Sequence, residues 1–315
     1  MIDKLVSVII ISYNHEAFID DCMQGVLAQT YHNIEVLYLD DSSSDNSYKK
    51  ADRYKNKLME KFGRVEFFEN RTNQGVVKNL NKLIPMCEGE YIKFIASDDF
   101  MLPSGIFDMV NYLENNSDSA MVYTNGIYGD ENMHFQLEIS YENAKKLYNA
   151  VPRFGTGLFE HLYESDEIMA PTVMIRKSTY DNIGLYDENI MVEDWDCFIR
   201  VALYGAIGYL DKPTVVYRFL STSFSHSGDP KRRIAMKKSE LLLLEKYKEY
   251  AKDEGKNRIA RSYNEAISDA CHICDKGYMQ FLKEYRKRNQ VYVTFRNRMK
   301  YVLYSMGFFG KAGER

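Results

Sequence analysis

The first 125 residues alternate between short apolar runs and segments with helical spacing. Residues 6–11 form an almost continuous β-branched run, which is typical of a strand buried on both faces. Residues 16–29 then place apolar side chains on one face of a helix. Further strands are predicted at 34–39, 65–68, 91–96 and 120–123, with helices at 76–86 and 104–115. This order predicts an α/β fold with a mostly parallel sheet and helices on both faces.

The pattern changes in the second half of the chain. Residues 125–165 are irregular, and residues 193–204 predict a helix with an acidic first turn. Beyond Pro230 the sequence consists of long helical patterns. A boundary is therefore expected near residues 226–230, between the α/β unit and a helical C-terminal region.

Each early strand is followed by polar or acidic residues. Ligands of open α/β sheets bind beyond the carboxyl ends of the strands, so these residues are expected to gather at one edge. Any one cluster is compatible with ordinary turn chemistry, and it is their shared location that indicates a site. The clusters are Ser12-Tyr13-Asn14, Asp40-Asp41, residues 70–73 and Ser97-Asp98-Asp99.

The cluster Ser97-Asp98-Asp99 places two adjacent carboxylates after a buried strand. Burial and mutual repulsion would raise their pKa values unless a cation lies beside them. A hard divalent ion such as Mg²⁺ or Mn²⁺ takes one or two carboxylates together with phosphate oxygens. The alternative is a helix cap before Pro103 and Ser104, since Asp also favours turns.

Asp40 and Asp41 suit a nucleotide, because a carboxylate at a strand end can accept a hydrogen bond from a ribose hydroxyl or a base N–H. Tyr13 could stack on the face of a base. The chain has no Gly-x-Gly-x-x-Gly after its first strand and no P-loop. We therefore expect phosphates to be held by the metal, with Arg71 or Lys78, rather than by a glycine cradle.

The acidic helix start Glu193-Asp194-Trp195-Asp196 surrounds the only tryptophan of the chain. Acidic residues in a first turn are favoured by the helix dipole, which is a purely structural reason for this pattern. A carboxylate beside a ring that stacks on a sugar could instead deprotonate an attacking hydroxyl. The sequence leaves both interpretations open.

Taken in order, these motifs resemble the family-two glycosyltransferases of GT-A fold, over residues 5 to about 220. The resemblance implies inverting transfer of a sugar from a nucleoside diphosphate sugar, commonly a UDP-sugar. It also implies a glycosyltransferase domain at 1–228, with a nucleotide-sugar half at about 1–124 and an acceptor half at about 125–228. A helical region at 229–315 follows. The segments that carry the resemblance are residues 6–14, 39–45, 73–79, 89–92, Ser97-Asp98-Asp99 and Glu193-Asp194.

The resemblance also implies roles for individual residues. Tyr13 and Asp41 match positions that stack on and hydrogen-bond the base, Asp98 matches a metal-ligating aspartate, and Asp194 matches the catalytic base. Asp98 and Asp99 are the expected ligands of Mn²⁺ or Mg²⁺, and Glu193 and Trp195 are expected at the acceptor. The remaining expected nucleotide-sugar contacts are Ser12, Asn14, Arg71, Asn73, Gly75, Lys78, Ser97 and Asp99.

Two departures from the family pattern change these expectations. Ala96 stands where the family has the first Asp of its Asp-x-Asp motif, so Asp98 lacks that partner. The Gln-x-x-Arg-Trp signature of processive members is absent, which favours adding one sugar to a glycan or polyprenyl-linked acceptor in surface polysaccharide synthesis. A sugar-nucleotide-binding subunit without turnover is the main alternative. A sugar-nucleotide pyrophosphorylase is disfavoured, because its Gly-rich basic loop is missing.

Composition and charge add a second feature. The 315 residues are 45% hydrophobic and 27% charged, which is typical of a globular protein. Residues 281–315 carry a net charge of +7, whereas the whole chain carries −4, so no nucleic-acid partner is expected. A basic tail with interleaved aromatic residues can lie on an anionic membrane surface. It can equally pair with the acidic body or with a second copy of the chain.

Neither a signal sequence nor a membrane-spanning run is recognisable. We therefore expect a cytoplasmic protein, with attachment at the inner face of the cell membrane if the tail binds lipid.

Overall fold

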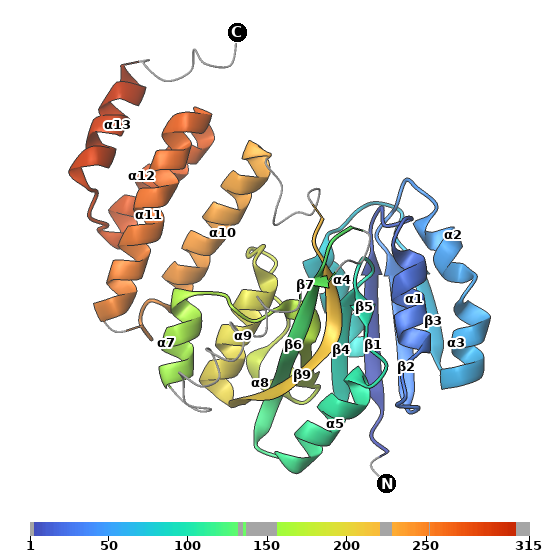
Figure 1. Ribbon diagram of the computed structural model, residues 1–315. Coiled ribbons are helices and arrows are strands. Elements are labelled where there is room, and N and C mark those ends of the chain that lie inside the picture. Colours follow the sequence, from blue (N-terminus) through green and yellow to red (C-terminus); the bar gives the residue numbers. More distant parts are fainter. Residues whose placement is uncertain (1–2, 132–134, 137–155, 221–228, 252, 307–315) are drawn as a thin grey trace. The chain divides into compact units, whose positions relative to one another are not determined.

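The computed structural model describes residues 3–131, 135–136, 156–220, 229–251 and 253–306 (Figure 1). The chain divides into two compact units. The first comprises residues 1–188 and 193–220, and the second residues 189–192 and 221–315. The domain boundary expected near 226–230 falls mostly on residues outside this description.

A single nine-stranded sheet forms the centre of the first unit as far as the structure describes it. Its order is β3-β2-β1-β4-β8-β6-β9-β5, with β7 paired to β6. β1, β2, β3 and β4 are parallel to one another, and β9 is parallel to β6. The strands are β1 (Val6–Ser12), β2 (Ile34–Asp40), β3 (Val65–Glu69), β4 (Tyr91–Ala96), β5 (Phe100–Met101), β6 (Ser119–Gly129), β7 (Phe135–Gln136), β8 (Val173–Arg176) and β9 (Ala206–Arg218).

Helices cover both faces of this sheet because the central strands are apolar on both sides. Every residue of β1 and β2 is buried. Val8 and Ile10 of β1 pack in one core cluster with side chains of α1, α3 and α5, whereas Leu80 of α4 and Phe198 of α9 lie against Phe94 of β4. The helices are α1 (Ile19–Leu27), α2 (Ser47–Asp52), α3 (Lys55–Phe62), α4 (Val76–Leu83), α5 (Gly105–Asn115), α7 (Thr156–Glu164), α8 (Thr179–Ile183) and α9 (Glu193–Tyr204).

The register aligns the carboxyl ends of the first four strands. Ser12 pairs with Asp40, Asp40 pairs with Glu69, and Ile11 pairs with Ala96. The predicted α/β architecture is therefore confirmed, and its polar loops follow strands that end at the same level. Two features were not predicted: β8 runs antiparallel between β4 and β6, and β9 extends over thirteen residues.

The second unit consists of four helices in its described residues: α10 (Pro230–Tyr247), α11 (Asp253–Ile273), α12 (Lys276–Asn289) and α13 (Phe295–Ser305). Asp229, Asp275 and Thr294 cap α10, α12 and α13 by accepting hydrogen bonds from backbone N–H groups of the first turns. The hydroxyl of buried Tyr285 donates to the Leu241 carbonyl at 2.9 Å. Across the described residues, no helix is both long and apolar enough to span a bilayer.

Candidate functional site

The loops that follow β1 and β2 are held together by their polar side chains. The backbone N–H groups of Asn14 and His15 donate to the hydroxyls of Ser43 and Ser47, at 2.9 and 2.8 Å. Asn14 adopts a positive φ of 55°, and its side-chain oxygen accepts from the Ser44 N–H at 2.8 Å. These contacts across about thirty residues fix the shape of the strand edge before any ligand binds.

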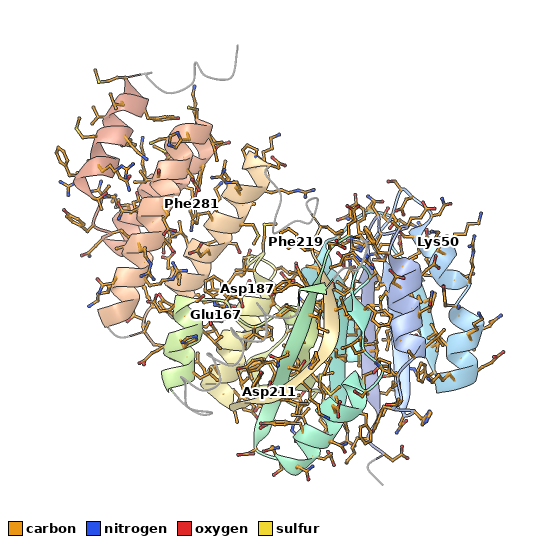
Figure 2. The ribbon with its side chains drawn as sticks, viewed as in Figure 1. Lys50, Glu167, Asp187, Asp211, Phe219 and Phe281 are labelled. Atoms are coloured by element: carbon orange, nitrogen blue, oxygen red, sulfur yellow. The ribbon has the colours of Figure 1, made fainter. Side chains whose placement is uncertain are left out.

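Lys50, labelled in Figure 2, adds a further link between the two loops. Its ammonium group donates to the backbone carbonyl of Glu16 at 2.9 Å. The Glu16 N–H in turn donates to Asp45 at 3.0 Å. The composition of the segment after β2 predicts a turn and a helix cap. In addition, its serine and aspartate side chains accept hydrogen bonds from the loop after β1.

Asp41 organises the loop that leads into α4. Its carboxylate accepts hydrogen bonds from the Asn70 side chain and from the backbone N–H groups of Gln74 and Gly75, each at 2.8 Å. Burial by itself would raise the pKa of Asp41, but these hydrogen bonds outweigh it and lower the pKa below its ordinary value. Gly75 can turn into α4 at φ +83° because it has no side chain.

Asp98 and Asp99, in the loop after β4, differ in exposure. The Asp98 side chain is 15% exposed and reaches solvent, whereas Asp99 is 1% exposed. One oxygen of Asp99 accepts from the Arg218 N–H at 2.9 Å, and the other, Oδ2, is buried without a hydrogen-bond partner. Burial, followed by the charge of Asp98, raises the pKa of Asp99 well above its ordinary value, although Lys93 and Arg218 oppose this.

Arg218, at the end of β9, clamps this loop. Its Nε donates to the Asp98 carbonyl at 2.8 Å, and its terminal nitrogens reach Asp21 and the Glu131 carbonyl, both at 2.6 Å. The guanidinium group also lies over the Phe18 ring, 4.7 Å from its centroid. Arg218 therefore fixes the main chain that carries Asp98. No sequence motif pointed to it, since 120 residues separate the two.

His15 is the second residue that the sequence patterns did not single out. Its Nδ1 lies 2.8 Å from the Ser97 hydroxyl and 3.8 Å from Oδ1 of Asp98. The loop after β1 thus meets the loop after β4 through an imidazole and a carboxylate.

Glu193 and Asp194 begin α9 on the opposite side of β4 from α1 and α5. They line a cavity of about 30 Å³, large enough for a single water molecule. Phe94 of β4 lines the same cavity. It lies two residues before Ala96, the last residue of β4, and the loop after β4 carries Asp98. The carboxylate of Asp194 accepts from the Trp195 N–H at 2.8 Å. Burial raises the pKa of Asp194, and burial followed by the charge of Asp194 raises that of Glu193 to about 8.

Residues 7–184 match the family described as glycosyl transferase family 2. The chain belongs to this family. A curated relative, an uncharacterized glycosyltransferase from Methanocaldococcus jannaschii, is 26% identical over 197 residues, which cover 62% of this chain and 64% of the relative. The chain thus spans less than two thirds of that relative's length.

Solved structures with little sequence identity share the fold of this family 2 chain. Staphylococcus aureus TarS in complex with UDP-GlcNAc has a TM-score of 0.57 and 19% identity, and the match covers 84% of this chain and 73% of TarS. The mannosyltransferase PcManGT of Pyrobaculum calidifontis, in complex with GDP-Man and Mn²⁺, has a TM-score of 0.59 and 14% identity. That match covers 97% of this chain and 85% of PcManGT. Both likenesses support the predicted GT-A fold.

Within this family 2 domain, several predicted contacts lie on exposed positions. Tyr13 is 46% exposed beyond β1, so its ring has a free surface for stacking. Arg71 and Asn73 are exposed between β3 and α4, and Lys78 is exposed on α4 itself. Ser12 and Ser97 are buried, and the Ser12 hydroxyl has no hydrogen-bond partner. Their predicted roles toward a nucleotide sugar stay predictions.

The structure corrects the interpretation of Trp195. The ring is 6% exposed, and its Nε1 donates to the Leu162 carbonyl at 2.5 Å. A sugar needs an open aromatic face for stacking, so Trp195 is a core residue that anchors α9 rather than an acceptor contact. The sequence misled because a tryptophan beside carboxylates is equally typical of a buried helix face.

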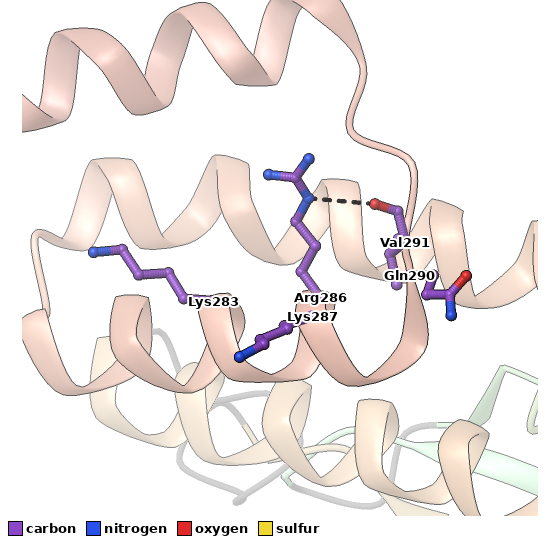
Figure 3. A pocket seen from close by; sticks show the side chains of 5 residues that line it. All are labelled: Lys283, Arg286, Lys287, Gln290 and Val291. Atoms are coloured by element: carbon purple, nitrogen blue, oxygen red, sulfur yellow. Dashed lines mark hydrogen bonds between the residues drawn. The ribbon is translucent and has the colours of Figure 1, made fainter.

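The basic tail is described only as far as residue 306, so residues 307–315 of the predicted segment lie outside the described range. In α12, Lys283, Arg286 and Lys287 line an open pocket of about 400 Å³ together with Gln290 and Val291 (Figure 3). Arg286 donates to the Val291 carbonyl at 3.4 Å. Part of the segment's positive charge, Arg286, Lys287 and Arg288, thus lies in the last turn of α12, where the helix dipole favours it.

Proposed function

We propose that the protein is a glycosyltransferase that moves one sugar, with inversion, from a nucleoside diphosphate sugar to a hydroxyl of a glycan or lipid-linked acceptor. The observation that carries this proposal is the strand edge. The loops after β1, β2 and β4 are joined by hydrogen bonds. Tyr13, His15 and Asp98 of these loops reach solvent at the strand edge. Membership of glycosyl transferase family 2 supports the same reaction class.

A nucleotide fits this edge in chemical terms. The exposed ring of Tyr13 can stack on a base, and Asp41 sets the loop that carries exposed Arg71 and Asn73. Cationic side chains at this loop suit an anionic diphosphate. We favour a uridine nucleotide because TarS binds UDP-GlcNAc in the same fold.

A divalent cation, Mn²⁺ or Mg²⁺, fits the loop after β4. Asp98 offers a carboxylate that reaches solvent, and Asp99 has one carboxylate oxygen without a hydrogen-bond partner. A cation beside Asp99 would lower the raised pKa of its carboxyl group. In the described part of the chain, no three His, Cys, Asp or Glu side chains gather closely enough to hold an ion. We therefore expect phosphate oxygens and water to complete the ligand set. When bound, the cation offsets negative charge on the departing diphosphate.

Asp194 is proposed as the base. It removes the proton from the acceptor hydroxyl while the oxygen bonds to the anomeric carbon and the bond from that carbon to the diphosphate oxygen breaks. A pKa raised by burial suits a group that must accept a proton near neutral pH. Glu193, which lines the same water-sized cavity as Asp194, is the proposed acceptor contact.

Thermal unfolding with a panel of nucleotide sugars, with and without Mn²⁺, tests the proposal first. A donor that binds only the folded protein raises its melting temperature. Product formation or slow donor hydrolysis with the stabilising donor then separates an enzyme from a binding subunit without turnover. Stabilisation by a donor without turnover on any acceptor would favour that subunit.

We further propose that the C-terminal helices attach the enzyme to an anionic membrane surface, close to a lipid-linked acceptor of surface polysaccharide synthesis. α13 carries Arg296, Arg298 and Lys300 beside exposed apolar side chains, of which Phe295 is 76% exposed. A basic helix with an open apolar face suits a membrane interface. Pairing with a second copy of the chain is the competing outcome.

A further inference from the structure

Ala96 leaves a gap in the donor set at the end of β4. Ala96 stands at the first position of the family's Asp-x-Asp motif, and a methyl group binds no cation. The register places Ala96 directly opposite Ile11, so the loops that leave β1 and β4 start at the same level. A replacement ligand from the loop after β1 is therefore within reach of Asp98.

His15 occupies this position. Its Nδ1 is 3.8 Å from Oδ1 of Asp98, and both side chains are largely buried yet reach solvent. The same nitrogen lies 2.8 Å from the Ser97 hydroxyl, in the turn that carries Asp98. An imidazole nitrogen and a carboxylate oxygen at this separation can serve one cation, since both are common ligands of transition metals.

Hydrogen bonds fix the backbone around His15, and contacts with Ser97 and Phe18 hold its ring in place without a ligand. Its N–H donates to Ser47 at 2.8 Å, and its carbonyl accepts from the N–H groups of Phe18 and Ile19 at 2.9 and 3.0 Å. The edge of its ring meets the Phe18 ring, with centroids 6.1 Å apart. Arg218 holds the facing loop through Asp98 and Asp99. Both halves of the pair are thus pre-organised.

We propose that His15 is a nitrogen ligand which, with Asp98, holds the divalent cation of the donor diphosphate in place of the carboxylate missing at position 96. The proposal rests on the proposed function, which supplies the diphosphate. Imidazole suits transition metals, whereas Mg²⁺ prefers oxygen ligands. The site therefore selects Mn²⁺ over Mg²⁺.

Pulsed electron paramagnetic resonance of Mn²⁺ bound to the full chain, with UDP present, tests this ligand directly. We expect an imidazole nitrogen coupling that changes when histidine is labelled with ¹⁵N and vanishes in His15→Gln. His32→Gln is the matched control. His32 is exposed just before the amino end of β2, away from the carboxyl ends of the strands. The His32→Gln variant should therefore retain the coupling. Mn²⁺ affinity should fall roughly tenfold or more in His15→Gln.

A second variant separates ligand loss from misfolding. Ala96→Asp added to His15→Gln supplies a carboxylate again, so it should restore cation affinity without the nitrogen coupling and shift preference toward Mg²⁺. Bound Mn²⁺ without histidine coupling in the wild-type protein would overturn the proposal while leaving the proposed function intact. A histidine coupling in a protein that turns over no donor would support His15 as a ligand and overturn the proposed function.

Discussion

Two carboxylates, Glu240 in the helical unit (15% exposed) and Asp99 at the strand edge (1% exposed), have opposite surroundings. Glu240 accepts from Lys237, Arg258 and Ser262 at 2.8, 2.9 and 2.5 Å. Burial alone would raise its pKa, but these partners lower it. Asp99 keeps an oxygen without a partner, and its pKa is raised. The ionised form of Asp99 is therefore less well stabilised by its surroundings than that of Glu240.

The largest expected effect comes from Asp194→Asn in the first unit. Loss of the base should reduce sugar transfer by roughly 10²- to 10⁴-fold, while donor affinity stays within about twofold. Steady-state rates and a donor titration measure the two quantities. Asp181→Asn, at an exposed position in the first turn of α8, is the matched control and should behave as wild type. Equal losses of donor binding and transfer would argue against Asp194 as the base.

Arg218→Lys is expected to have the next largest effect. Lysine cannot reproduce the several directed hydrogen bonds by which Arg218 holds the Asp98 carbonyl and Asp21. Mn²⁺ affinity in the presence of UDP should fall roughly 10- to 100-fold, as for other residues that position a metal ligand. Calorimetry measures this loss. Lys212→Arg, on the same strand in an exposed ion pair with Asp108, should change nothing; unaltered affinity in Arg218→Lys would refute the clamp.

The paired variants Glu240→Gln and Asp99→Asn test the difference between the surroundings of these two carboxylates. Glu240→Gln removes the carboxylate that Lys237 and Arg258 share, although Lys237 keeps its ion pair with Glu265. Urea unfolding should therefore show a loss of about 1–3 kcal/mol at pH 7. Asp99→Asn removes a poorly satisfied buried charge and should unfold at the same urea concentration or higher. A similar loss of stability in both variants would remove the distinction between them.

The pH dependence of the same two residues follows from the signs of their pKa shifts. Glu240, with its pKa lowered, stabilises the fold fully above its ordinary value of 4.5, and this contribution is lost as the pH falls from that value through the lowered pKa of the folded state. Asp99, with its pKa raised, destabilises the fold where it is ionised, and protonation on acidification relieves this. Wild-type minus variant stability, measured from pH 7 down to about 3, should therefore fall below pH 4.5 for Glu240 and rise on acidification for Asp99.

The sequence predicted the parallel half of the sheet well because its information is local. Residues 6–11 and 34–39 are apolar except for Ser7 and Glu35, and the polar groups at their ends need only a shared register to meet. β9 was missed because Asp211, Lys212 and Pro213 interrupt its apolar pattern, and these three residues are exposed in the structure. Its ends are buried against neighbouring strands, which only the tertiary fold determines.

For the candidate site too, local sequence patterns indicated some residues and missed those that depend on contacts far along the chain. Asp41 and Asp98 follow strands directly, so their spacing along the chain identifies them. His15 and Arg218 act through contacts across 83 and 120 residues, and neither lies in a motif of its own. Trp195 was assigned to the acceptor because composition does not distinguish a buried ring from an exposed one.

The smallest expected effect on catalysis comes from the helical unit. Reversing the charges of Arg296, Arg298 and Lys300 to glutamate should leave transfer to a soluble acceptor within about twofold, because none of them belongs to the strand edge. Each cation near an anionic surface contributes about 1 kcal/mol of attraction, so binding to phosphatidylserine vesicles should fall at least tenfold in a sedimentation assay. Replacing the same residues by lysine or arginine is the control. Unchanged vesicle binding, together with a change from dimer to monomer in light scattering, would assign α13 to a second copy of the chain instead.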